Sequence, residues 1–245
     1  EGIEAVVARQ GRPAAVVEVL EAPVAGFVGV VVPVLEADER ALPLARQRCS
    51  TILNAVPDVA ERAMQPVSAA PTSVRLVLVA RMAPPKRPDI LLHALALLRT
   101  QHGLEPPTTI VGDGPHLAAH QALAQQLHLH HVVFMGERDD VAHCLAQHQV
   151  FVLLSEHEGL PISILEAMRA GLAILASDLP GLRELLPPSH GVLVENTPAA
   201  VATALQRLLH DGLLRQQLAQ RARLRYEQAH SPAHMAQAVL NVYRT

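Results

Sequence analysis

The amino-acid sequence predicts an α/β protein built on a parallel, doubly wound sheet, and two observations support this prediction. From residue 74 onward, short apolar runs alternate with amphipathic stretches of helical period. The run at 150–154 is short and rich in β-branched residues, and it is continuously apolar, as is typical of a strand buried on both faces. After it, Leu165, Met168 and Leu172 recur at helical spacing, so this stretch is predicted as strand, loop and helix.

The same patterns place the other elements of the sheet. Strands are expected at 75–80, 108–112, 132–135, 150–154, 173–176 and 192–194. Helices are expected at 88–101, 115–128, 139–148, 161–170, 181–186 and 198–210. Ligands of such sheets bind beyond the carboxyl ends of the strands. The functional residues are therefore expected in loops 81–87, 112–115, 136–140, 155–162 and 177–182.

Capping residues predict where the helices in the last part of the chain begin and end. Asn196 or Thr197 is expected to cap the helix that Pro198 begins, and Asp211-Gly212 is expected to end it. A Gln/Arg-rich helix then covers 213–227, and Ser231-Pro232 begins a last helix that reaches Tyr243.

The first part of the chain has a different character. Strand-like runs occur at 5–8, 14–20 and 28–34, and residues 30–53 are predicted as strand, helix (36–48) and strand (51–53). Residues 1–56 are therefore expected to be the remnant of a first lobe. The Ala-, Pro- and Ser-rich residues 57–72 are expected to be a linker, followed by a second lobe over 73–230 and a final helix over 231–245.

Composition excludes several classes of function. The net charge of −3 gives no general attraction to nucleic acid, and three Phe, two Tyr and no Trp offer few platforms for base stacking. Cys49 and Cys144 lie far apart outside any C-x-x-C, and the cluster His128, His130 and His131 lacks zinc-ligand spacing, so no metal site is expected. No apolar run approaches the ~20 residues of a membrane helix. Residence in the cytoplasm is expected, with contact to the inner face of a membrane left open.

The stretch 155–171 suits the binding of an anion. Pro161 falls near the first helical turn, where its missing N–H costs nothing, and Gly159 gives the preceding loop freedom. The unpaired amides of Leu160, Ile162 and Ser163 would face a phosphate, reinforced by the helix dipole.

Four charged residues complete this expected site. Glu158 and Glu166 flank the start of the helix and could accept hydrogen bonds from sugar hydroxyls on either side of a diphosphate. Arg81 and Lys86 follow the first strand of the sheet and could neutralise the diphosphate itself.

The pattern E-G-L-P-x-S-x-L-E-A-M-x-A-G at 158–171 resembles the signature of retaining glycosyltransferases of family four, which have the two-lobed GT-B fold. The R-x4-K spacing of Arg81 and Lys86, the loop V-G-D-G-P at 111–115 and the segment F-M-G-E-R at 134–138 match the same family. One departure is Ala80, where the family usually has Gly.

The resemblance implies a role for each matched residue. Glu158, Arg81 and Lys86 would be catalytic, with Glu158 on the transferred sugar and both cations on the diphosphate. Donor binding would fall to Glu166 on the ribose, to the amides from Leu160 to Ile162 on the distal phosphate, and to the loops around the base. The full implied donor-binding set is Glu166, Gly159, Leu160, Pro161, Ile162, Gly112, Gly114, Gly136 and Arg138.

The resemblance further implies transfer of a sugar from a nucleoside-diphosphate donor, with uracil as the expected base, without a cofactor or metal, and with retention of configuration. The acceptor is unknown: a saccharide, a lipid-linked saccharide or a small molecule. Three alternatives stay open. The chain could be a nucleotide-sugar-binding lobe that is inactive without a separate acceptor lobe, a GT-B epimerase, or a doubly wound domain for another phosphate ligand.

Overall fold

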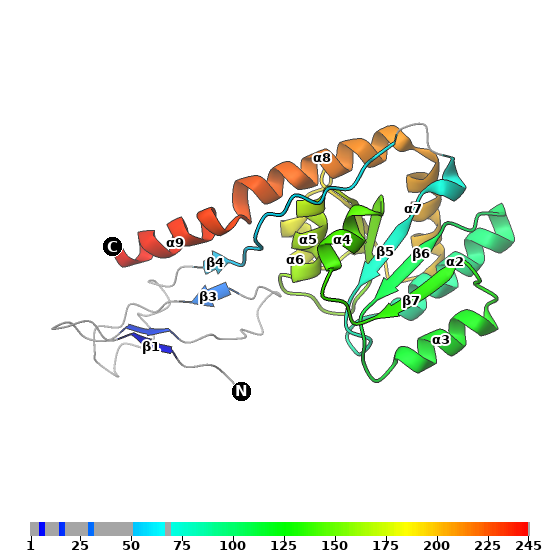
Figure 1. The fold of residues 1–245 in the computed structure, drawn as a ribbon, viewed down its shortest axis with the longest axis horizontal. Coiled ribbons are helices and arrows are strands. Elements are labelled where there is room, and N and C mark those ends of the chain that lie inside the picture. The colour runs from blue at the N-terminus through cyan, green and yellow to red at the C-terminus, as the bar shows by residue number, and fades with distance from the viewer. Residues whose placement is uncertain (1–4, 8–14, 18–28, 32–50, 67–69, 245) are drawn as a thin grey trace.

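The computed structural model describes residues 5–7, 15–17, 29–31, 51–66 and 70–244. A six-stranded sheet with helices packed around it forms the larger, right-hand part of the molecule in Figure 1, and every pair of neighbouring strands in it is parallel. The strand order is β10-β9-β8-β5-β6-β7. This arrangement confirms the predicted α/β class. The strands are β5 (Leu76–Val79), β6 (Thr108–Val111), β7 (Val132–Gly136), β8 (Val150–Leu153), β9 (Ala173–Ser177) and β10 (Val192–Val194).

The helices also lie where the sequence places them. They are α2 (Pro88–His102), α3 (Leu117–Gln126), α4 (Val141–Ala146), α5 (Ile162–Ala170), α6 (Pro180–Leu185), α7 (Pro198–His210), α8 (Gly212–Ala229) and α9 (Pro232–Arg244). Two starts differ by two residues: α3 begins at Leu117 where the expected helix began at Pro115, and α4 begins at Val141 where the expected helix began at 139. The amide of His116 donates to the carbonyl of Met82 (2.9 Å), so the residues before α3 are held against another loop.

Both faces of the sheet are covered, which explains why its strands are continuously apolar. Val150 and Val152 of β8 belong to a core shared with α2 and α7, whereas Phe151 and Leu153 belong to a second core shared with α5 and α6. All four side chains are fully buried. Alternate residues of one strand therefore serve opposite layers.

The strand order creates a crevice at the carboxyl edge of the sheet. From β5 the chain proceeds outward to β6 and β7, and it then returns to the other side of β5 to form β8, β9 and β10. The loops that follow β5 and β8 consequently lead away in opposite directions from two adjacent strands. This switch point is where open α/β sheets bind their ligands.

Residues 54–66 contain no helix or strand and run along α8 before the chain enters the sheet (Figure 1). The amide of Val56 donates to the carbonyl of His230 (3.2 Å), and the Tyr226 hydroxyl donates to the carbonyl of Val56 (2.8 Å). Arg223 forms an ion pair with Asp58 (2.8 Å) and lowers the pKa of that carboxyl to about 2. The segment is thus attached to α8 at several points.

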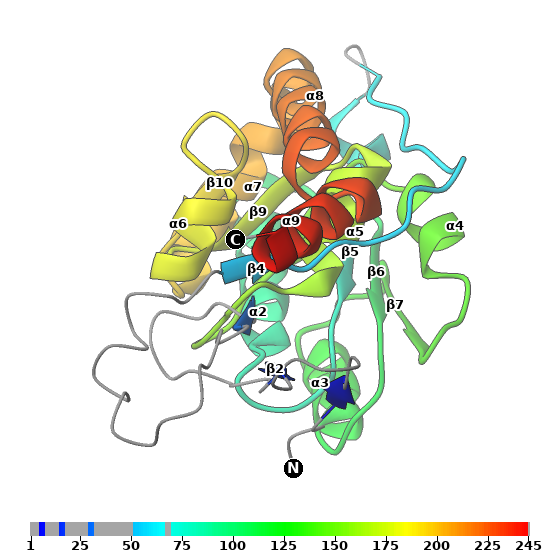
Figure 2. The ribbon, with the colours of Figure 1, turned by 90° about the vertical axis from the view of Figure 1, so that its left-hand side faces the viewer.

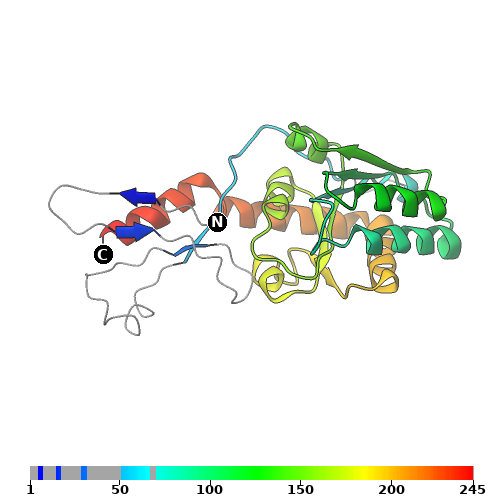
Figure 3. The same cartoon turned by 90° about the horizontal axis from the view of Figure 1, so that it is seen from below.

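The strands before residue 54 lie outside the six-stranded sheet. β1 (Ala5–Val7) pairs antiparallel with β2 (Ala15–Val17), and β3 (Gly29–Val31) pairs antiparallel with β4 (Thr51–Leu53). β4 lies beside α9, as the view along α9 shows (Figure 2), and α9 extends beyond the sheet (Figure 3). The expected helix over 36–48 lies outside the described residues.

Nowhere in the described residues does a helix have both the length and the apolar character needed to cross a lipid bilayer.

Candidate functional site

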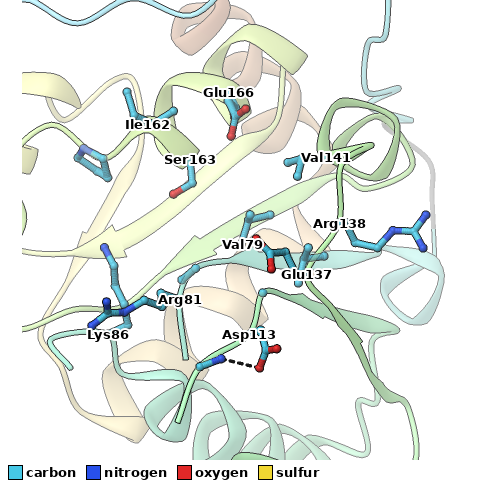
Figure 4. A pocket seen from close by; sticks show the side chains of 15 residues that line it. Val79, Arg81, Lys86, Asp113, Glu137, Arg138, Val141, Ile162, Ser163 and Glu166 are labelled. Atoms are coloured by element: carbon cyan, nitrogen blue, oxygen red, sulfur yellow. Dashed lines mark hydrogen bonds between the residues drawn. The ribbon is translucent and has the colours of Figure 1, made fainter. Parts of the chain in front are cut away.

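A cleft of about 910 Å³ opens at the switch point of the sheet (Figure 4). Its walls come from the carboxyl ends of β5, β6 and β7 and from the first turn of α5. The residues that line it are Val79, Ala80, Arg81, Lys86, Val111, Gly112, Asp113, Gly114, Glu137, Arg138, Val141, Pro161, Ile162, Ser163 and Glu166. Four of the five loops expected to carry function therefore contribute; the loop 177–182 does not.

The first turn of α5 presents free amides to this cleft. Pro161 precedes the helix in an extended conformation, and the first α5 amide with a protein acceptor in the described part of the chain is that of Ile164, which donates to the Pro161 carbonyl (3.0 Å). The amides of Ile162 and Ser163 are left for a ligand. Together with the helix dipole they form a site for an anion.

Arg81 is an exposed cation of the cleft. It follows β5 directly, and its side chain forms no ion pair with any acid in the described residues. The guanidinium is therefore free to pair with an anion in the cleft, and its role toward a diphosphate stays a prediction.

Lys86 is differently placed, because its ammonium group forms an ion pair with Glu158. The Glu158 side chain is only 7% exposed and does not line the cleft. Glu158 therefore contacts Lys86, which lines the cleft, but it does not itself face the cleft. Arg87 and Glu156 form a second ion pair between the same two loops (2.8 Å). The Glu156 amide also donates to the Pro85 carbonyl (2.9 Å), so the loops after β5 and β8 are tightly joined.

Glu166 projects from the first turns of α5 into the cleft (Figure 4). The side chain is partly buried and accepts no hydrogen bond from any group in the described residues. Burial raises the pKa of this carboxyl above its ordinary value, and the nearby Arg169 offsets only part of the effect. A half-buried acid without a partner is costly for the fold, which favours a role in binding.

Gly112 and Gly114 allow the loop after β6 to press on the loop after β5. Both have positive φ, and a Cβ at Gly112 would lie 2.0 Å from the Ala80 carbonyl oxygen. At Gly114 a Cβ would lie 2.7 Å from the carbonyl oxygen of Met82. Both glycines line the cleft, and the structure shows that their absent side chains let the backbone around Arg81 take its position.

Replacing Gly112 with alanine should therefore lower the free energy of unfolding by about 2–3 kcal/mol, since the methyl group meets backbone and the positive φ is strained. Chemical denaturation measures this change. Gly103→Ala is the matched control: Gly103 also has positive φ, but nothing lies within 4 Å of the added methyl group, so a loss of about 1 kcal/mol is expected. Equal losses in the two variants would contradict the packing explanation.

The end of β7 contributes two charged side chains with different surroundings. Arg138 donates to Asp140 from two nitrogens (2.8 and 2.7 Å), and its guanidinium points away from the other labelled side chains (Figure 4). Glu137 also lines the cleft and forms no ion pair in the described residues. Gly136 does not line the cleft, but its carbonyl accepts from the Gly112 amide (2.7 Å).

The cleft thus contains eight of the twelve residues predicted for the site: Arg81, Lys86, Gly112, Gly114, Arg138, Pro161, Ile162 and Glu166. Outside its lining lie Gly136, Glu158, Gly159 and Leu160, and the Leu160 side chain is buried in the core. The prediction did not include Asp113, Glu137 and Val141, although Asp113 and Glu137 stand in loops at the carboxyl edge and Val141 begins α4 directly after one of these loops. That position was the signal that could have found them.

A metal centre is not evident in the part of the chain that the structure describes, since no three His, Cys, Asp or Glu side chains there gather around a common point.

Comparison with known proteins gives the family of this chain. The family described as "Glycosyl transferases group 1" matches residues 60–225, which is more than half of the sequence and includes every residue that lines the cleft. The chain belongs to the group 1 glycosyl transferases.

Curated relatives of this glycosyl transferase chain include the O-antigen biosynthesis glycosyltransferase WbnH of Escherichia coli, which is 33% identical over 56% of the chain. The N-acetyl-alpha-D-glucosaminyl L-malate synthase of Bacillus anthracis is 31% identical over 66% of the chain. The chain matches only 38% and 43% of the length of these two proteins. The match therefore covers less than half of the length of these curated relatives.

Solved structures show the same fold. Staphylococcus aureus TarM, crystallised with fondaparinux, alpha-GlcNAc-glycerol and UDP, gives a TM-score of 0.71 at 22% identity, over 85% of this chain and 43% of TarM. Anabaena HepE in complex with UDP and glucose gives 0.68 at 20% identity, over 80% of this chain and 56% of that chain. The likeness establishes the architecture of the group 1 glycosyl transferase chain, whose neighbours are GT-B glycosyltransferases.

Proposed function

We propose that this chain binds the sugar donor in a glycosyltransferase that moves a sugar from a nucleoside diphosphate to an acceptor with retention of configuration. One observation supports this most: Arg81, the free amides of α5 and the half-buried Glu166 meet in a single cleft at the switch point of the sheet. A cation, a helix terminus and a hydroxyl acceptor are what a sugar diphosphate requires.

In this proposal each group of the cleft takes one part of the donor. Arg81 and Lys86 neutralise the diphosphate, and the amides of Ile162 and Ser163 bind its distal phosphate. Glu166 accepts hydrogen bonds from the ribose hydroxyls. Glu158 acts on the hydroxyls of the transferred sugar, and its ion pair with Lys86 holds its side chain in place.

The chemistry follows from these positions. The bond between the anomeric carbon and the diphosphate breaks, and its electron pair leaves with the diphosphate oxygen. Arg81 stabilises the charge that grows on this leaving group. The acceptor hydroxyl attacks from the same face, and its proton passes to the departing phosphate. The protein then mainly positions the donor, and no protein nucleophile is required.

The proposed donor is linked to uridine diphosphate. Structures of TarM and HepE that contain UDP support this choice, although their similarity to the chain is in fold. A different relative, from Mycobacterium tuberculosis, is named as a GDP-mannose-dependent mannosyltransferase. UDP, GDP and ADP must therefore be compared directly. The proposed acceptor is a saccharide, lipid-linked saccharide or small molecule met in the cytoplasm or at the inner face of a membrane, in polysaccharide or glycoconjugate synthesis.

Titration with UDP, GDP and ADP tests the donor site. At least one should raise the melting temperature, since a ligand at a hundredfold excess over its Kd stabilises the folded state by about 2.7 kcal/mol. Failure of all three to bind would refute the proposal. A matched variant, Arg183→Ala, changes an exposed arginine outside the cleft and should leave the shift intact.

A transfer assay then separates the remaining possibilities. The chain matches less than half of the length of its curated relatives, so donor binding without turnover would identify a donor-binding lobe that needs a separate acceptor lobe. A change of sugar stereochemistry without any acceptor would identify an epimerase.

A further inference from the structure

A closed ring of hydrogen bonds lies behind the cleft, at the carboxyl ends of β8, β9 and β10. The Ser155 amide donates to Ser177 Oγ (2.8 Å), and Ser177 Oγ donates to Asn196 Oδ1 (2.6 Å). Asn196 Nδ2 donates in turn to the Ser155 carbonyl (2.8 Å). Ser155 and Ser177 are buried, with 0% and 1% exposure. The side chains of Ser177 and Asn196 thus satisfy both polar groups of the Ser155 backbone.

Ser155 is also the point where this ring meets the loop after β5. Its hydroxyl lies within hydrogen-bond distance of the Pro85 carbonyl (3.2 Å) and the His157 carbonyl (2.8 Å). The backbones of Ser155 and Lys86 also pair in a single antiparallel β-bridge. Every polar atom of Ser155 is therefore used, and its partners come from its own loop and from three other parts of the chain.

The ring does not touch the space where a donor would lie, because Ser155, Ser177 and Asn196 are absent from the residues that line the cleft. Beyond Ser155, however, the chain leads within three residues to Glu158, whose carboxylate pairs with Lys86. An interior ring of this kind has a single fully satisfied arrangement, so it fixes the peptide that begins this loop.

We propose that Ser177 and Asn196 are positioning residues for the donor sugar. They hold the Ser155 peptide, which sets where the loop 155–160 begins and hence where Glu158 stands relative to Lys86. This inference rests on the proposed function of the cleft. In the proposed function, Arg81, Glu166 and the α5 amides hold most of the nucleoside diphosphate, so the ring should affect binding of the sugar part of the donor much more than binding of the nucleoside diphosphate part.

The test compares Ser177→Ala and Asn196→Ala with the unchanged chain. Each is titrated with one nucleoside diphosphate and the matching nucleotide sugar, chosen by the base that the unchanged chain binds. The pair is UDP and UDP-glucose, GDP and GDP-mannose, or ADP and ADP-glucose. Both variants should lower affinity for the sugar-linked nucleotide about tenfold, with little change for the free diphosphate, because a small displacement of a positioned group is costly. Ser177→Thr keeps the hydroxyl and should restore binding.

Thr108→Val is the matched control. The Thr108 hydroxyl is equally buried and donates to the Pro106 carbonyl (2.9 Å), but it lies at the opposite end of the sheet from the cleft. The Thr108→Val variant should be less stable, but the ratio of its affinities for the sugar-linked nucleotide and the free nucleoside diphosphate should not change. Equal losses for both nucleotides in the Ser177 and Asn196 variants, or the same change of ratio in Thr108→Val, would overturn the inference.

Hydrogen exchange of the amides in 155–160 gives a readout that needs no ligand. Ser177→Ala and Asn196→Ala should speed exchange there about tenfold, and Thr108→Val should not. Unchanged exchange in both variants would overturn the inference even if the cleft binds nucleotides. Failure of the unchanged chain to bind any nucleoside diphosphate would instead refute the proposed function, so the two failures are distinguishable.

Discussion

Arg81→Ala is expected to lower kcat/KM for the sugar donor by about 10²–10³-fold, the usual loss when one preorganised charge-stabilising group is removed. Arg81 is exposed in the cleft and forms no ion pair within the described residues, so its charge is fully available to the diphosphate. The charge of Lys86, by contrast, is already shared with Glu158. Steady-state kinetics with the donor identified by titration measures the loss.

The control for this variant is again Arg183→Ala, which removes an arginine that pairs with Asp178 outside the cleft. Its kinetics should match those of the unchanged chain. If Arg81→Ala kept more than about a tenth of the original kcat/KM, the assignment of Arg81 to the leaving diphosphate would be wrong.

Glu166→Gln should have two opposite effects. Burial raises the pKa of Glu166 in the folded state, so the ionised carboxylate destabilises the fold at neutral pH. Glutamine removes that cost and should raise the melting temperature at pH 7.5 by a few degrees. The same change removes a charged acceptor for the ribose hydroxyls and should weaken nucleotide binding about tenfold to hundredfold.

The pH dependence gives the sign of the stability effect. In the unchanged chain, the destabilisation by Glu166 begins as pH rises above the ordinary pKa of 4.5. It grows until pH exceeds the raised pKa of the folded state, and it is constant above that value. The advantage of Glu166→Gln should therefore shrink as pH falls and vanish below 4.5, where the carboxyl is protonated in both states. Glu184→Gln, at an exposed site outside the cleft, is the control. A glutamine variant less stable at pH 7.5 would contradict this account.

Most of the fold could be predicted because the strands are buried on both faces and appear as continuous apolar runs. The start of α3 could not, since it depends on a bond between His116 and Met82 that only the folded chain brings together. Asn196 was a possible cap of α7, but Thr197 Oγ1 takes that role by accepting from the Ala200 amide (3.2 Å). Asn196 is then free to join Ser155 and Ser177, which no local pattern reveals.

In the candidate site, too, some features follow from local sequence patterns and others depend on tertiary contacts. Arg81 and Glu166 lie in the cleft because strand ends and helix starts of an α/β sheet meet at one edge, which is a general rule. The ion pair of Lys86 and Glu158 joins residues that are far apart in the sequence, and both had been assigned to the ligand. Gly112 and Gly114 carry a steric role toward Ala80 and Met82 that depends on tertiary contact.

The attachment of residues 54–66 to α8 determines where the polypeptide can be shortened. A fragment that began at the first strand of the sheet would lose the Val56 carbonyl, leaving the buried hydroxyl of Tyr226 without its acceptor. It would also remove Asp58 from Arg223, which stacks on the Tyr226 ring (4.9 Å). An excised version of the sheet should therefore start no later than Asn54, so that α8 keeps the backbone and carboxylate partners of Tyr226 and Arg223.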